Sequence, residues 1–127
     1  MDRILIRDLL VRCIIGTTDD ERREKQDVVI NVVLWADLRR AAKTDSIADA
    51  VNYRTIKKHI LSAVEASQYH LVEALAECIA GICLENPAVQ QVQVNVEKPS
   101  ALRFARSVGV EIRRGRSGEA WLGCSSV

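Results

Sequence analysis

Lys98 stands at a position where a charged side chain could take part in proton transfer. It ends the segment Val92-Gln93-Val94-Asn95-Val96-Glu97-Lys98, in which valines alternate with polar residues as in a half-buried β-strand. Lys98 has the same parity as the valines, so its ammonium group points to the buried side. Pro99 follows and has no amide hydrogen for further strand pairing. A partly desolvated lysine at a strand end suits acid–base chemistry, and the structural alternative is a lysine whose stem bends out to water.

Three further residues could act with Lys98. Glu73 falls in the first turn of an expected helix, where the helix dipole stabilises a carboxylate that could accept two parallel N–H bonds from an aminopyrimidine edge. Tyr53 opens another expected helix, where a phenol can donate, accept and stack. Glu21 lies in a charge-rich loop at residues 16–25. Each has an ordinary alternative, because first-turn glutamates are common and charged loops are usually solvated.

The elements that must position these residues follow from the hydrophobic pattern. Alternating apolar residues predict four strands, at residues 4–15, 26–38, 92–98 and 108–112. Helical spacing predicts two helices, at residues 53–68 and 71–85. A β-bulge near Asp8 would restore the inward face of the first strand, and Asn52 would cap the first helix. The connections at residues 17–25 and 39–50 are expected to be irregular.

The resulting order is ββααββ, an α+β fold with a four-stranded antiparallel sheet and two helices on one face. The pattern predicts a single domain at residues 1–114. Residues 115–127 lack periodicity and are expected to form a flexible tail. The last two strands have a polar opposite face and open edges, and edge strands must be covered or paired. We therefore expect neighbouring subunits to join edge to edge in a homo-oligomeric ring with a wet lumen.

The composition limits the possible functions. The chain has 127 residues, 48% hydrophobic and 28% charged, which is typical of one soluble globular domain. A formal net charge of +1 gives no general field for nucleic acid or anionic membrane. No apolar run could span a bilayer and no signal peptide is recognisable, so we expect a cytoplasmic protein. The four cysteines form no CxxC pair and only two histidines are present, so neither a metal site nor a disulfide framework is expected.

Several motifs in order resemble the dihydroneopterin aldolase family over residues 2–114. They are Val51-Asn52-Tyr53, Leu71-Val72-Glu73, Val96-Glu97-Lys98-Pro99 and Val108-Gly109-Val110. The resemblance implies the tunnelling fold, in which ββααββ subunits form tetrameric barrels that stack as octamers. It also implies sites between adjacent subunits that bind a pterin, with no cofactor and no metal.

The resemblance further implies a role for each candidate residue. Glu73 anchors the pterin with help from the backbone around Leu71 and Val72. Lys98, Tyr53 and Glu21 are catalytic, and the neighbouring subunit contributes Tyr53. The substrate-binding residues also include the two that precede Tyr53, namely Val51 and Asn52. Several members have histidine where this chain has Asn52.

The implied reaction is retro-aldol cleavage of 7,8-dihydroneopterin in folate biosynthesis, giving 6-hydroxymethyl-7,8-dihydropterin and glycolaldehyde. The related epimerase branch, which inverts the 2′ centre of dihydroneopterin or its triphosphate, is the main alternative, and Arg103 and Arg106 could meet a triphosphate. A non-catalytic RNA-binding module is a remote alternative. Such modules stack bases on exposed aromatic residues of a sheet, and here the candidate face offers only Trp35.

Overall fold

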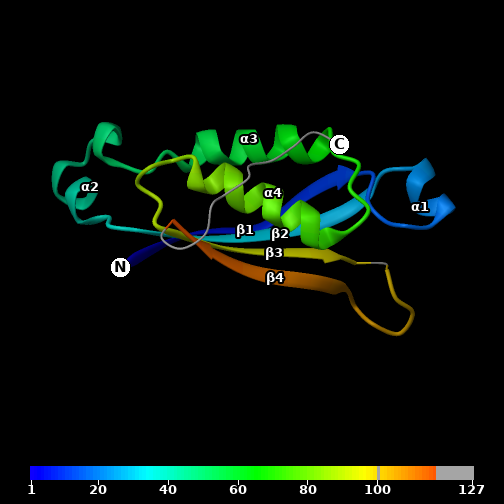
Figure 1. The fold of residues 1–127 in the computed structure, drawn as a ribbon. Coiled ribbons are helices and arrows are strands. Elements are labelled where there is room, and N and C mark those ends of the chain that lie inside the picture. The colour runs from blue at the N-terminus through cyan, green and yellow to red at the C-terminus, as the bar shows by residue number, and fades with distance from the viewer. Residues whose placement is uncertain (100, 117–127) are drawn as a thin grey trace.

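The protein is built on a four-stranded antiparallel sheet (Figure 1), and the computed structural model describes residues 1–99 and 101–116. The strands lie side by side in the order of the sequence. They are β1 (Asp2–Cys13), β2 (Gln26–Ala36), β3 (Gln91–Lys98) and β4 (Val108–Gly115). The outer strands β1 and β4 therefore leave the two edges of the sheet open within one chain.

Two helices, α3 (Tyr53–Glu65) and α4 (Val72–Leu84), cover one face of this sheet (Figure 1). The core lies between the layers and is aliphatic: Val92, Val94 and Val96 of β3 are fully buried. The side-chain oxygen of Asn52 accepts a hydrogen bond from the Thr55 amide, so the expected cap of α3 is confirmed. Such caps satisfy amides that have no partner within the helix.

The expected bulge in β1 is also confirmed. The pairing of β1 with β2 shifts register between Ile6 and Leu9, and Asp8 has a φ of 54°. The Asp8 amide donates to Oδ1 of Asn31 on the neighbouring strand at 2.9 Å. The shift restores the alternation beyond the bulge, so that Val11 faces the core.

The connections are more ordered than expected. The stretch between β1 and β2 contains a short helix, α1 (Asp19–Arg23), and residues 39–50 contain α2 (Arg39–Thr44) and a 3₁₀ turn, Ile47–Asp49. None of these elements contains a buried residue. Helices that contribute nothing to the core show no hydrophobic periodicity, which explains why the pattern missed them.

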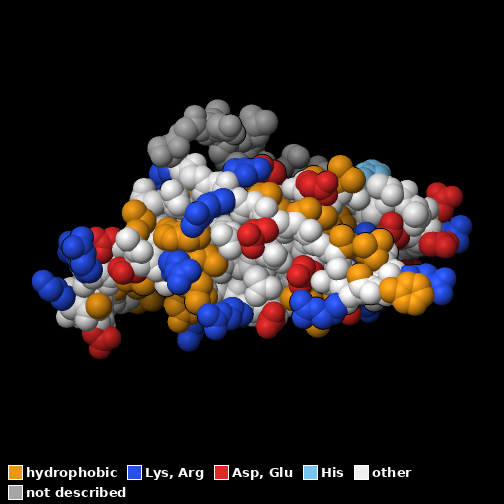
Figure 2. Space-filling view, turned by 90° about the horizontal axis from the view of Figure 1, so that it is seen from below, with side chains coloured by type: hydrophobic (Ala, Val, Ile, Leu, Met, Phe, Trp, Pro, Cys, Tyr) orange, Lys and Arg blue, Asp and Glu red, His pale blue; other side chains and the backbone are white. Residues whose placement is uncertain are grey.

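The face of the sheet that the helices do not cover carries both basic and acidic side chains (Figure 2). Trp35 lies on this face with the guanidinium of Arg113 4.2 Å from its ring centre. Trp35, the sheet aromatic named in the sequence analysis, is half-buried and is already in contact with a side chain of the same chain.

At the end of the described chain, Arg116 donates to the backbone oxygens of Leu84, Asn86 and Val89, which joins β4 to the end of α4. Residues 117–127, most of the expected tail, lie outside the described residues. Cys13 and Cys83 are buried free thiols. Cys78 is disulfide-bonded, which the cysteine spacing did not lead us to expect.

Candidate active site

The end of β3 brings two of the candidate residues into direct contact. Nζ of Lys98 lies 2.6 Å from Oε2 of Glu21, and their side chains are 12% and 26% exposed. Lys98 follows the buried valines of β3 with the same parity, so its stem lies along the covered face of the sheet, as predicted. Glu21 comes from α1, 77 positions earlier in the chain. The ion pair therefore joins the loop after β1 to the end of β3.

The Glu21 carboxylate is held by several donors besides Lys98. Thr18 and Glu21 form a capping box at the start of α1, and Oε1 of Glu21 accepts from the amide of Thr17 at 3.2 Å and from Thr18. The side-chain amide of Gln26 reaches Oε2 at 3.4 Å. The hydrogen bond from Lys98, followed by those from Gln26 and Thr18, lowers the pKa of Glu21 to about 2 against the opposing effect of desolvation. Glu21 is therefore a carboxylate at physiological pH.

Gly16 makes this arrangement possible. Its φ of 130° is unfavourable for any residue with a side chain. A Cβ at this position would lie 2.3–2.5 Å from the carboxylate atoms of Glu21. The Glu21 side chain therefore lies directly against the Gly16 backbone, and any larger residue at position 16 would displace it.

The start of α4 presents a second group of candidate residues. Leu71 is the N-cap residue but offers no side-chain hydrogen bond to the helix, and its side chain is 52% exposed. Amides of a first helical turn have no acceptor within the helix, so those near Val72 are available to a ligand. Glu73 is exposed in the same turn, where the positive end of the helix dipole favours an anion.

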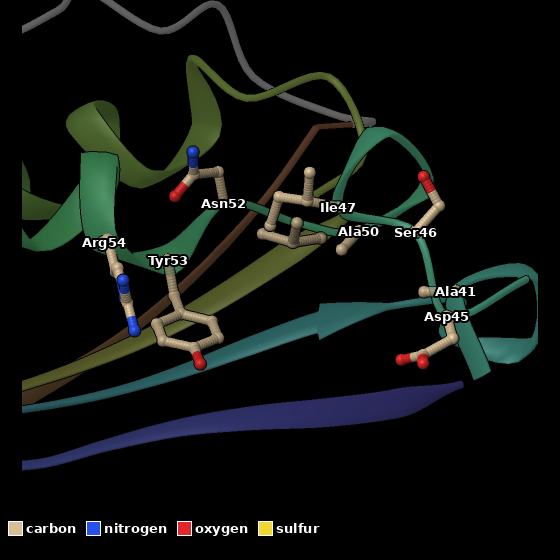
Figure 3. Close-up of a pocket in the computed structure, with 9 residues that line it drawn as sticks. Ala41, Asp45, Ser46, Ile47, Ala50, Asn52, Tyr53 and Arg54 are labelled. Atoms are coloured by element: carbon tan, nitrogen blue, oxygen red, sulfur yellow. The ribbon is translucent and has the colours of Figure 1, made fainter.

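A separate pocket of about 490 Å³ surrounds the start of α3 (Figure 3). Tyr53 is 51% exposed and lines this pocket together with Arg54. Val51 is buried, and the side chain of Asn52 is engaged in capping α3. Of the three candidate residues in this segment, Tyr53 thus has the side chain most available to a ligand.

The two groups of residues lie at opposite ends of the subunit (Figure 1). Lys98, Glu21 and Glu73 belong to the end where β3 finishes and α4 begins. Tyr53 belongs to the other end, where α3 begins beside α2. One chain therefore does not bring the two groups of candidate residues together. We call the group with Lys98 the amine half-site and the group with Tyr53 the tyrosine half-site.

Two residues that lie against the Glu21 carboxylate, Gly16 and Gln26, were not singled out as site residues in the sequence analysis. The sequence did contain a signal for the helix that carries Glu21, because Thr18-Asp19-Asp20-Glu21 matches the capping-box pattern that begins helices.

Neither a group of three metal-binding side chains nor a helix suited to crossing a membrane occurs within residues 1–99 and 101–116.

A family model described as dihydroneopterin aldolase matches residues 4–113. The chain belongs to the dihydroneopterin aldolase family. A solved structure of Escherichia coli dihydroneopterin aldolase in complex with neopterin superposes with a TM-score of 0.87 at 36% identity, covering 91% of this chain and 100% of that one. The fold expected from the sequence, a tunnelling-fold subunit of the dihydroneopterin aldolase family, is confirmed.

Two relatives show how the family is divided. The chain is 41% identical to a dihydroneopterin triphosphate 2′-epimerase of Pseudomonas aeruginosa over 112 residues, which are 88% of this chain and 91% of that protein. It is 39% identical over 114 residues, 90% of its length, to the folic acid synthesis protein FOL1 of Dictyostelium discoideum, but spans only 17% of that relative. The family thus contains both single-domain enzymes and segments of larger proteins.

Proposed function

We propose that this chain cleaves 7,8-dihydroneopterin by a retro-aldol reaction to 6-hydroxymethyl-7,8-dihydropterin and glycolaldehyde, as a step of folate biosynthesis. The observation that carries the proposal is the Lys98–Glu21 pair, 2.6 Å apart at the end of β3, in a chain of the dihydroneopterin aldolase family. The similarity to an aldolase whose structure holds neopterin supports a pterin as the ligand.

The reaction needs a base, an acid and an electron acceptor. A base removes the proton of the 2′-hydroxyl group, and the bond between the first two side-chain carbons breaks to release glycolaldehyde. The C=N bond of the dihydropterin ring is conjugated to the side chain and accepts the electron pair, so no Schiff base is needed. Protonation of the resulting enamine gives the hydroxymethyl product. The protein has to position the substrate and move two protons.

Lys98 is the residue to which we assign the proton transfer. Glu21 remains ionised because its pKa is about 2, so its carboxylate holds the ammonium group of Lys98 at the end of β3. Lys98 and a water molecule would form the proton relay with Tyr53. Glu73 would accept two N–H bonds from the pterin edge, and the amide near Val72 would donate to the same ring.

The site would be completed by a second copy of the chain. Each chain holds an amine half-site at one end and a tyrosine half-site at the other, and β1 and β4 are open edges. Edge-to-edge pairing of identical subunits closes these edges and could place Tyr53 of one copy beside Lys98 of the next. A tetrameric ring, stacked in pairs as an octamer, is the assembly that we propose.

A cytoplasmic location stays a prediction.

The epimerase reaction is the second candidate, favoured by the 41% identity to the Pseudomonas aeruginosa epimerase. The same bond breaks in both reactions. In an epimerase the aldehyde stays bound and adds back through its other face, which inverts the 2′ centre. The two reactions therefore require the same amine half-site and differ in whether the aldehyde escapes.

Product analysis tests both candidates. Purified protein is incubated separately with 7,8-dihydroneopterin and with its triphosphate, and glycolaldehyde and the pterin products are separated by chromatography. Free glycolaldehyde with 6-hydroxymethyl-7,8-dihydropterin would support the aldolase. Conversion to the 2′ epimer without free aldehyde would instead support the epimerase, and no conversion of either substrate would refute the proposal.

A further inference from the structure

Arg22 connects the helix that carries Glu21 to the connection between α3 and α4. Its Nη1 donates to the backbone oxygens of Gly16 at 3.3 Å and Tyr69 at 3.0 Å. Its Nη2 donates to the backbone oxygen of Gln68 at 2.8 Å. One guanidinium group thus binds three carbonyls that belong to two segments, and two of them lie 46 and 47 positions away in the chain.

The α1 helix depends on such attachments for its position. It has five residues and none of them is buried, and a helix of this length is not stable by itself. The capping box with Thr18 shapes its first turn but joins it to nothing outside the loop. Arg22 is the next residue after Glu21, so the bonds of Arg22 to Gln68 and Tyr69 hold this turn of α1 against the body of the protein.

Two of these carbonyls, those of Gln68 and Tyr69, lie shortly before the start of α4. The oxygen of Tyr69 accepts both from Arg22 and from the amide of Gly16, at 3.3 Å. Leu71 and Glu73 follow within four residues. The bonds of Arg22 therefore fix α1 and the approach to α4 relative to each other, and these two segments carry the carboxylates of Glu21 and Glu73.

We propose that Arg22 is a positioning residue for the reaction. It holds Glu21 against Lys98, and it fixes the position of that ion pair relative to the first turn of α4, which in the proposed function anchors the pterin. This inference rests on the proposed function for its effect on catalysis. Arg22 itself does not touch the reacting atoms. An arginine suits this role because its planar group offers several N–H donors in a fixed geometry, which a lysine cannot reproduce.

Arg23 provides a matched control on the same helix. Its guanidinium bonds only to Asp20 among the contacts that the structure describes, and both side chains are largely exposed, at 73% and 92%. Arg22→Ala and Arg23→Ala remove the same charge from adjacent positions. They differ in that only Arg22 joins α1 to the α3–α4 connection. Arg22→Lys keeps the positive charge but loses the planar guanidinium group with its several N–H donors.

The first test is kinetic. Displacements of about 1 Å at a catalytic group can cost about 10²-fold in rate, so Arg22→Ala should lower kcat/KM by about 10- to 100-fold. Arg22→Lys should fall between the wild type and Arg22→Ala, and Arg23→Ala should stay at the wild-type value. Free guanidinium ion, added well below denaturing concentrations, should restore part of the activity of Arg22→Ala only. Full activity of a folded Arg22→Ala, or equal losses in both alanine variants, would overturn the inference.

The second test does not depend on turnover. The amides of Thr17 and Thr18 donate to Glu21, so their hydrogen exchange reports whether Glu21 is held in place. Exchange at both amides should be faster in Arg22→Ala than in Arg23→Ala. Equal exchange rates in the two variants would contradict the inference that Arg22 holds Glu21 in place. If the wild type proved inactive on dihydroneopterins, the proposed function would fail, and this measurement would still decide whether Arg22 positions Glu21.

Discussion

Replacing Glu21 with glutamine should remove a stabilisation that depends on pH. Folding lowers the pKa of this carboxyl from 4.5 to about 2, mainly through the hydrogen bond from Lys98. This lowering of the pKa corresponds to at most about 3.5 kcal/mol, since each tenfold change in an equilibrium constant is worth roughly 1.4 kcal/mol. The side chain is 26% exposed, so solvent screening reduces this to about 1–2 kcal/mol.

The sign follows from the direction of the pKa shift. Because the pKa is lower in the folded state, the stabilisation is fully present above the unfolded pKa of 4.5 and is lost as the pH falls towards the folded value. Protonated glutamic acid and glutamine are similar in shape. The wild type should therefore approach Glu21→Gln in stability as the pH falls from 4.5 towards 2.

Urea unfolding of both proteins, from about pH 7 to about pH 3, measures this difference. Asp37 also has a pKa of about 2, because Arg39 donates to its carboxylate, but this contribution is common to both proteins and cancels. Asp20→Asn, which breaks the exposed pair on the same helix, is the control. The difference in unfolding free energy between this variant and the wild type should not decrease as the pH falls. A wild-type advantage that is absent at neutral pH, or that persists unchanged at low pH, would refute the role of the ion pair.

Three other substitutions have expected outcomes. Lys98→Ala should lower turnover by about 10²–10⁴-fold, the usual contribution of general acid–base catalysis, with pterin binding, measured by fluorescence titration, largely retained. Gly16→Ala should cost about 1–3 kcal/mol in unfolding free energy because of its positive φ, and it should also lower kcat by displacing Glu21. Asn52→Ala should cost about 1 kcal/mol by removing the cap on the Thr55 amide; an unchanged melting temperature would contradict that role.

The elements that bury apolar surface could be predicted from the sequence. The parity of Lys98 with the valines of β3 placed its side chain on the covered face, and the slip in alternation near Asp8 marked the bulge. Asn52 was recognisable as a cap from residue type and position. In each case the signal is local, because the hydrophobic pattern and the capping preference act over a few neighbouring residues.

The contacts of α1 could not be predicted in the same way. Glu21 and Arg22 lie in a run of charged residues with no apolar periodicity, and such runs are usually solvated. Their partners, Lys98 and Tyr69, are 77 and 47 positions away, and no local pattern encodes that distance. The capping-box signature of Thr18 and Glu21 could have revealed the helix but not what it contacts.

The separation of the two half-sites has a consequence for mixed assemblies. In the proposed head-to-tail ring, a chain that lacks Lys98 and a chain that lacks Tyr53 damage different junctions. Where the Lys98 end of the second chain meets the Tyr53 end of the first, both groups are intact. Two variants that are each inactive alone would thus complement each other when they assemble together. Whether a mutation is dominant in this enzyme would depend on which of the two half-sites it alters.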